Sequence, residues 1–302
     1  MPDSSEFITF VAEKSGIRKP NLIEKDLMLH RILKDIYGSR HFAENYLFKG
    51  GSCLVKCYFG YHRFSVDLDF TWQDQKVWAG LGKRELRRRL LEEISSFGVS
   101  LEKIVQDTGL EFKNELKSKR YFEFGAGSRM VTFKLWKNSE LTKSQVNFVD
   151  EILFPQRIVT VRTLLDDVQL SKDEKAYFEE FLEFYKPFNV KAYDSQEILC
   201  EKVRAVLTRR TQKLRDFYDL FTLEKSGCSI EALKDQIIVK MKACLQFKRY
   251  RENLERNRGS LDFSAVLEDP FARELFVAKP PKDFDVFLKR LPDALKDILN
   301  RV

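Results

Sequence analysis

The sequence predicts an α+β fold, in which a mixed sheet with flanking helices precedes a helical C-terminal region. Residues 64–72 (FSVDLDFTW) alternate between apolar and polar side chains, as in a strand with one buried face. Residues 121–136 have the pattern of a β-hairpin around a glycine-rich turn. Beyond about residue 160 the strand patterns fade, and apolar residues recur at helical spacing instead. Strands and helices mixed in this way indicate a layered α+β sheet domain.

Each element of this fold has a local reason in the sequence. Pro20 at the first turn and apolar residues at helical spacing predict a helix at 20–37. Further elements are expected as a strand at 45–48, a short apolar helix after residue 52, the strand at 64–72, a charged helix at 84–97, a hairpin of 121–124 with 130–136, and a strand at 145–153. Later helices are expected at 172–185, 195–209, 214–226, 229–248 and 283–299. We therefore expect one domain at residues 1–160 and a helical domain at residues 161–302.

The composition is that of a soluble globular protein. Of its 302 residues, 43% are hydrophobic and 33% are charged, and the formal charge of +7 mildly favours polyanionic partners. No apolar run of about 18 residues is present, and the first residues lack the pattern of a secretory signal. The five cysteines form no CxxC pair, which disfavours zinc and favours a reducing compartment. We expect a cytoplasmic protein without membrane association.

Two carboxylates on the strand at 64–72 carry the most informative pattern. Asp67 and Asp69 are two residues apart, so a strand projects both from one face. Such a pair can share Mg²⁺ ions, or Mn²⁺, which bind oxygen ligands. A solvated strand face is the ordinary interpretation of Asp-x-Asp alone. The upstream Gly50 and Gly51 change that interpretation, because glycine lets backbone N–H groups approach a phosphate closely. Together these residues predict a metal–triphosphate site.

Longer stretches of sequence point to the same site. Residues 49–52 (KGGS) followed by residues 63–70 (RFSVDLDF) resemble the first motif of the AbiEii/AbiGii toxin family of nucleotidyltransferases. Residues 197–220 (EILCEKVRAVLTRRTQKLRDFYDL) and residues 23–26 (IEKD) are similar to further features of that family. These similarities extend from the first predicted helix into the C-terminal region, in the order that the family has.

The resemblance implies a fold, a reaction and a set of residues. The fold would be the DNA polymerase β-like nucleotidyltransferase fold, with the helical domain contributing to the active-site cleft. A nucleoside monophosphate would pass from an NTP to an acceptor, with Mg²⁺ held by Asp67 and Asp69. The nucleotide would be bound by Lys49, Gly50, Gly51, Ser52, Arg63 and Ser65. Lys202 would bind phosphate, and Asp216 would complete the catalytic set.

A biological setting also follows from the resemblance. Family members act as toxins of toxin–antitoxin or phage-defence systems, so a cognate antitoxin is the expected protein partner. Some members modify the 3′ end of tRNA, which makes tRNA the expected acceptor. Two other functions stay open at this point. One is nucleotidyl transfer to a small molecule or protein hydroxyl, and the other is non-catalytic binding of RNA or nucleotides.

One position departs from the wider superfamily. Polymerase β-like enzymes often carry a third carboxylate on a later strand, and the strand at 145–153 places Asn147 there. Asp150 has the opposite strand parity, whereas Glu151 has the same parity as Asn147. Either the site uses a helical acid beside Asp67 and Asp69, or the register of this strand differs from the expected one.

A basic stretch near the C-terminus has two interpretations. Residues 240–258 (KMKACLQFKRYRENLERNR) interleave Lys and Arg with Phe247 and Tyr250. Such a segment could bind RNA phosphates while its aromatic rings stack on bases. An amphipathic helix with a charged outer face would produce the same pattern.

Overall fold

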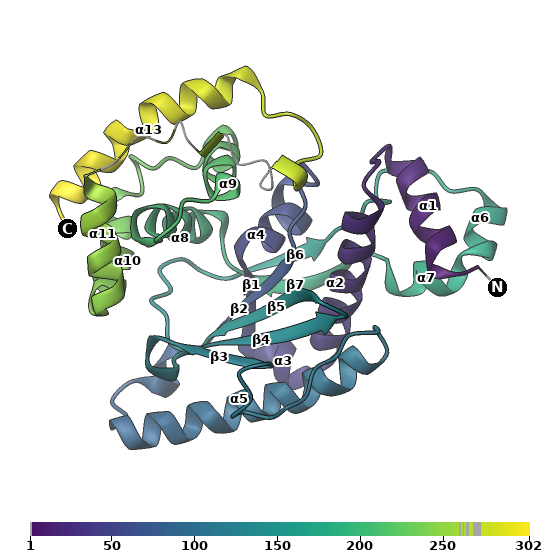
Figure 1. The fold of residues 1–302 in the computed structure, drawn as a ribbon, viewed down its shortest axis with the longest axis horizontal. Coiled ribbons are helices and arrows are strands. Elements are labelled where there is room, and N and C mark those ends of the chain that lie inside the picture. The colour runs from purple at the N-terminus through teal and green to yellow at the C-terminus, as the bar shows by residue number, and fades with distance from the viewer. Residues whose placement is uncertain (1, 260, 262, 264–265, 268–272) are drawn as a thin grey trace. The chain divides into compact units, whose positions relative to one another are not determined.

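The computed structural model describes residues 2–259, 261, 263, 266–267 and 273–302, and it confirms a mixed α+β fold (Figure 1). The strands are β1 (Tyr46–Lys49), β2 (Asp67–Trp72), β3 (Phe122–Gly125), β4 (Met130–Lys137), β5 (Glu140–Asn147), β6 (Arg157–Val161) and β7 (Phe188–Ala192). The α-helices are α1 (Ser4–Ser15), α2 (Pro20–Gly38), α3 (Arg40–Asn45), α4 (Gly50–Cys53), α5 (Lys83–Gln106), α6 (Lys172–Tyr177), α7 (Glu179–Phe184), α8 (Ser195–Thr208), α9 (Leu214–Lys225), α10 (Lys234–Leu245), α11 (Lys248–Arg258) and α13 (Lys282–Asn300). A π-helical segment, η1 (Leu54–Phe59), continues α4, and short 3₁₀ turns lie at η2 (Gln75–Trp78) and η3 (Ala126–Ser128).

The chain divides into two compact units. Unit 1 comprises Met1–Asp150 and Arg157–Ala192, and unit 2 comprises Glu151–Gln156 and Tyr193–Val302. Residues 161–192, which the sequence assigned to the helical domain, therefore cluster with the sheet. The reason is β7, which brings this segment back to pair with β1 and β6.

Unit 1 is built on a seven-stranded sheet in the order β3-β4-β5-β2-β1-β7-β6. β2 runs parallel to β5, and β1 runs parallel to β7, while the remaining neighbours are antiparallel. The sheet is therefore mixed, as the sequence predicted, and β2 with its two aspartates lies near its centre.

Aromatic residues fill the core on one face of this sheet. Phe70 of β2 contacts Phe42 of α3, with ring centroids 5.0 Å apart, and Phe97 of α5 contacts Phe133 of β4 at 4.6 Å. Helices α3 and α5 thus cover the face to which Phe70 and Phe133 point (Figure 1). Because side chains alternate along a strand, the residues on either side of Phe70 project from the opposite face.

Two strands differ from their sequence-based expectation for physical reasons. The strand expected at 145–153 is β5, which begins earlier and ends at Asn147. Its inward positions include Thr142 and Ser144, which are buried although polar, so the apolar alternation that marks a strand is missing there. β7 is only five residues long and follows directly on a helical stretch, which hid it from the pattern.

Unit 2 is helical, and α8 is its central element. Helices α9, α10 and α11 all pack against α8. Two asparagines of α11 satisfy carbonyl groups at the C-terminal end of α8: Asn253 donates to the oxygen of Thr208, and Asn257 donates to those of Leu207 and Arg209. This arrangement fixes the end of the helix that carries Lys202.

Within the described part of the chain, no helix combines the length and apolar character that crossing a membrane requires.

Candidate active site

The two aspartates of β2 lie on the face of the sheet opposite its aromatic core. Asp67 and Asp69 are both half-buried, whereas the intervening Leu68 and the following Phe70 are fully buried. This alternation is the one that the sequence predicted for a strand with one apolar face. The structure therefore places both carboxylates on a common side, as a shared cation site requires.

Strand register defines the neighbours of this pair. Lys49 of β1 lies opposite Asp69, and on the other side β5 places Lys143 opposite Asp67 and Gln145 opposite Asp69. Directly paired residues on adjacent strands have Cβ atoms within about 4.5–5.5 Å of each other. The aspartates thus have an amine or an amide at each of these adjacent positions.

The position at which a third carboxylate was expected, Asn147, lies at the end of β5. Asn147 lies opposite Thr71, two residue pairs beyond Asp69, and it is the last residue of β5. Glu151 lies after the end of β5 and belongs to unit 2. β5 therefore ends before Asp150 and Glu151, so neither of these acids lies on the strand.

Asp150, which the strand pattern directed away from the site, reaches it through Lys49. The Lys49 Nζ lies 3.2 Å from the Asp150 Oδ2, and Lys49 is buried. Gln75 fixes this segment, because its Oε1 accepts from the Asp150 N–H at 2.9 Å and its Nε2 donates to the carbonyl of Phe148. The sequence feature that could have indicated this ion pair is Lys49, because a buried ammonium group needs a counter-charge.

The glycine turn leaves no room for a side chain beside Asp69. Gly50 has a φ of +74°, and a Cβ built on it would lie 2.3 Å from the Asp69 Oδ2. A Cβ on Gly51 would lie 2.6 Å from the Arg63 Nη2 and 3.2 Å from the Ser65 Oγ. The backbone of the turn therefore approaches the side chains of the first motif as closely as only glycine allows.

Ser52 and Arg63 hold this turn against β2. The Ser52 hydroxyl donates a hydrogen bond to the backbone oxygen of Asp67. Arg63 is fully buried, and its Nη1 donates to the oxygen of Phe64 at 2.8 Å. All eight residues predicted for the first motif therefore come together in unit 1, around one end of β1 and the face of β2.

Asp26 anchors the helix that follows the glycine turn. Its Oδ1 lies 2.7 Å from the Lys56 Nζ of η1, and its Oδ2 accepts hydrogen bonds from the hydroxyls of Tyr61 and Tyr185 at 2.8 Å each. Burial, followed by the charge of Asp26, raises the pKa of both tyrosines well above the ordinary range, so both stay protonated donors. The sequence noted Asp26 within a family feature, and the structure gives it a role in positioning this helix.

Lys202 and Asp216 come together in unit 2. The Lys202 Nζ lies 2.7 Å from the Asp216 Oδ1 and 2.6 Å from the Asp219 Oδ2, and Arg209 also pairs with Asp216. Burial by itself would raise the pKa of Asp216, but the charges of Lys202 and Arg209 outweigh it and hold this pKa below its ordinary value. Asp219 was missed as a partner of Lys202, because spacing alone paired it with Arg215.

The residues of unit 1 fit a divalent cation in type and placement. Two carboxylates share a face, and the absence of a Cβ at Gly50 leaves the Asp69 carboxylate accessible from the turn. Carboxylate oxygens are the ligands that Mg²⁺ and Mn²⁺ prefer. Within the described residues, His, Cys, Asp and Glu side chains form no group of three or more suited to a metal ion. A cation here would therefore rely on the aspartate pair and on substrate oxygens.

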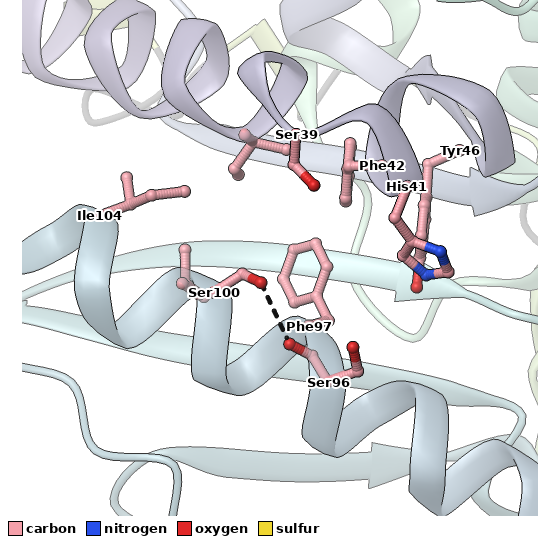
Figure 2. A pocket seen from close by; sticks show the side chains of 10 residues that line it. Ser39, His41, Phe42, Tyr46, Ser96, Phe97, Ser100 and Ile104 are labelled. Carbon is pink, nitrogen blue, oxygen red and sulfur yellow. Dashed lines mark hydrogen bonds between the residues drawn. The ribbon is translucent and has the colours of Figure 1, made fainter.

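An apolar pocket lies on the other side of the sheet and is unsuited to this chemistry. Figure 2 shows the rings of Phe42, Phe97 and Tyr46 beside His41, between α3 and α5. Its lining includes Ile36, Leu101 and Ile104 but no lysine or arginine. A triphosphate would find no cation among these side chains.

Comparison with known proteins gives a matching family and likenesses to solved structures. Residues 31–301 match the family model described as "Nucleotidyl transferase AbiEii toxin, Type IV TA system". No curated protein matches the chain. Among solved structures, the chain is similar to the nucleotidyltransferase toxin MenT4 from Mycobacterium tuberculosis H37Rv, with 18% identity and a TM-score of 0.55 over 97% of this chain and 98% of that chain. An antigenic nucleotidyltransferase-like protein from Paracoccidioides brasiliensis is 12% identical with a TM-score of 0.31, over 80% of this chain and 92% of that chain.

Proposed function

The chain belongs to the AbiEii family of nucleotidyltransferase toxins from type IV toxin–antitoxin systems, and we propose from this premise that it transfers a nucleoside monophosphate from an NTP to the 3′ end of tRNA. The observation that carries the proposal is the close approach of Gly50 to the Asp69 carboxylate, together with the hydrogen bond from Ser52 to the backbone oxygen of Asp67. Transfer of a nucleotidyl group needs positioning and charge neutralisation more than it needs covalent chemistry.

Asp67 and Asp69 hold Mg²⁺ in this proposal. A bound Mg²⁺ ion supplies positive charge to the phosphate oxygens and lowers the pKa of a hydroxyl bound to it. Gly50, Gly51 and Ser52 bring backbone N–H groups to the triphosphate, and Ser65 orients the groups around the cation. Lys49 and Arg63 are buried cations close to the glycine turn, which suits them as phosphate ligands.

The reaction breaks a phosphoanhydride bond of the NTP and forms a phosphodiester bond to the acceptor. An acceptor hydroxyl oxygen attacks the α-phosphorus and releases its proton to solvent. The bond from that phosphorus to the bridging oxygen breaks, and pyrophosphate leaves with the bonding electrons. Lys202 acts as a phosphate ligand. Asp216 orients Lys202, which the contact of 2.7 Å between them supports.

A polyanionic acceptor suits the charge of the protein. The formal charge is +7, and α11 carries five basic residues: Lys248, Arg249, Arg251, Arg256 and Arg258. Counterion release on binding phosphates would then make affinity for tRNA fall as salt is raised. The cognate antitoxin is the proposed protein partner, and the cytoplasm is the proposed compartment.

An acceptor assay with the Asp67→Asn variant tests this function. Wild-type protein incubated with each α-labelled NTP, Mg²⁺ and total tRNA should label tRNA at its 3′ end. Asp67→Asn should reduce the rate at least about 100-fold, since one metal-binding carboxylate is lost, while the thermal unfolding temperature stays near that of the wild type. The exposed Asp107, at the end of α5, provides the matched control Asp107→Asn, which should transfer normally.

The outcome also separates the alternatives. Label on small molecules or on protein, with none on tRNA, would replace the acceptor but keep the aspartate chemistry. Binding of NTP without transfer to any acceptor, or full activity in Asp67→Asn, would contradict the proposed mechanism.

A further inference from the structure

Lys143 occupies the strand position directly beside Asp67. The register pairs Asp67 of β2 with Lys143 of β5, and it pairs Asp69 with Gln145. Lys143 and Gln145 are half-buried. Thr142, which precedes Lys143, and Ser144, which precedes Gln145, are buried on the opposite face. By strand alternation, Lys143 therefore projects from the same face of the sheet as the aspartate pair.

The next lysine on this face already has a counter-charge. Lys134 of β4 lies opposite Lys143, and its Nζ is 3.2 Å from a carboxylate oxygen of Glu123. Lys143 is different: among the residues that the structure describes, no side-chain hydrogen bond or ion pair engages its ammonium group. Partial burial weakens the hydration of this ammonium group, so it would attract the phosphate oxygens of a bound nucleotide.

The charge of the site supports a definite role for this amine. Two carboxylates carry two negative charges, which one divalent cation balances. A second divalent cation beside Asp67 would lie close to the Lys143 ammonium, and like charges at short range repel strongly where water is partly excluded. A phosphate oxygen, in contrast, would be attracted both to the cation and to the amine.

We propose that Lys143 is a phosphate-binding residue of the transfer site, and that the Asp67–Asp69 pair consequently takes a single divalent cation. The Lys143 ammonium donates to a non-bridging oxygen of the reacting NTP and supplies the charge that a second cation would otherwise bring. The inference rests on the proposed function, since it needs the aspartates to bind a cation and the site to bind an NTP.

Binding measurements test the inference without relying on turnover. The probes are Mn²⁺, counted by the loss of its free electron paramagnetic resonance signal, and the α,β-methylene analogues of the four ribonucleoside triphosphates. With the analogue that binds most tightly, the wild type should hold one Mn²⁺ per chain beyond that bound by the analogue alone. Lys143→Met should weaken analogue binding at least 10-fold, and Lys143→Arg should restore most of it. Lys134→Met, the matched control one strand away, should stay within 2-fold of the wild type.

Failure of this inference differs from failure of the proposed function. Two Mn²⁺ ions per wild-type chain, or unchanged analogue binding in Lys143→Met, would overturn the role of Lys143. A double variant, Asp67→Asn with Asp69→Asn, that still binds Mn²⁺ like the wild type would overturn the aspartate site itself. Circular dichroism of each variant verifies that the sheet is retained, and Lys143→Gln, which has a polar and shorter side chain, replaces Lys143→Met if that variant does not fold.

Discussion

Buried lysines mark the structurally important places in this chain at the residue scale. Four of them lie against carboxylates: Lys49 with Asp150, Lys56 with Asp26, Lys202 with Asp216 and Asp219, and Lys240 with Glu197. Removing one partner of such a pair costs about 3–5 kcal/mol, because a charge is left buried without compensation. The sequence identified Lys49 and Lys202 by their motifs and placed Asp216 with Lys202, but it could not predict Asp150 as the partner of Lys49. Lys49 and Asp150 lie 101 residues apart, and only the fold brings them together.

Gly50→Ala should disable the site more than it destabilises the protein. The alanine Cβ would meet the Asp69 carboxylate at 2.3 Å and would also hold an unfavourable φ of +74°. The left-handed conformation costs roughly 1–2 kcal/mol for a non-glycine residue, and displacement of Asp69 should lower the transfer rate at least about 100-fold.

Gly16→Ala isolates the backbone part of that effect. Gly16 has a φ of +71°, and its Cβ would have no heavy atom within 4 Å. Urea denaturation should show similar destabilisation for both variants, while transfer stays normal in Gly16→Ala. Equal activity in the two variants would remove the steric argument for the glycine turn.

His30 of α2 should make stability depend on pH in the mildly acidic range. Burial, and then the charge of Lys56, hold the pKa of His30 well below its ordinary value of 6.5. Above pH 6.5 this group contributes no pH dependence, since it is neutral in the folded and the unfolded chain. As the pH falls below 6.5, only the unfolded chain takes up the proton, so stability is lost by up to about 1.4 kcal/mol per pH unit until the folded pKa is reached.

His30→Leu should abolish that part of the pH dependence. The free energies of unfolding of wild type and variant, measured in urea at pH 8 and pH 5, should converge or cross as the pH is lowered. The variant loses the hydrogen bond between the His30 Nε2 and the Lys186 oxygen, which lowers its stability equally at both pH values. A wild-type advantage of the same size at pH 8 and pH 5 would show that His30 is not the group responsible.

At the scale of elements, the sequence predicted the helices and strands in which the spacing of apolar residues follows from one buried face. α2, β2, the β3–β4 hairpin and α8 were expected close to their observed bounds, because their apolar residues follow one period. α1 and β7 were not expected. β5 was misplaced because Thr142 and Ser144 face its core, and a polar residue in a buried position removes the alternation that predicts a strand. The position expected for a third carboxylate, residue 147, was counted along this misplaced strand.

Carbonyl groups at the C-terminal end of α8 receive hydrogen bonds from side chains of the neighbouring helix α11. The Asn257 Nδ2 of α11 donates to the oxygens of Leu207 and Arg209 at 2.9 and 2.8 Å. Asn257→Ala should lower the free energy of unfolding by about 1–3 kcal/mol, because buried carbonyl groups lose their donor. Asn300→Ala, which alters an exposed asparagine of α13, should have little effect in the same urea titration. Equal stability of the two variants would contradict the role of Asn257 as a cap.

At the scale of the whole molecule, the chain passes between the two units three times, after residues 150, 156 and 192. The segment Glu151–Gln156 belongs to unit 2, although the residues on both sides of it belong to unit 1. The Glu197 Oε2 holds this segment by accepting hydrogen bonds from the N–H groups of Leu153 and Phe154 at 2.8 Å each. The sequence could not predict this arrangement, because nothing local marks a loop whose backbone is bound by a glutamate from a later helix.

The sheet should fold only when the chain extends through β7. A fragment of residues 1–160 keeps β1 but lacks the strand that pairs with both β1 and β6, so β6 has no partner in the sheet. It also lacks Tyr185, whose hydroxyl donates to Asp26 inside unit 1. A fragment of residues 1–192 retains all seven strands and these contacts. We therefore expect cooperative urea unfolding, followed by circular dichroism, for 1–192 and not for 1–160. Equally cooperative unfolding of 1–160, with the same strand signal, would place the boundary at residue 160 and would make β7 dispensable to the sheet.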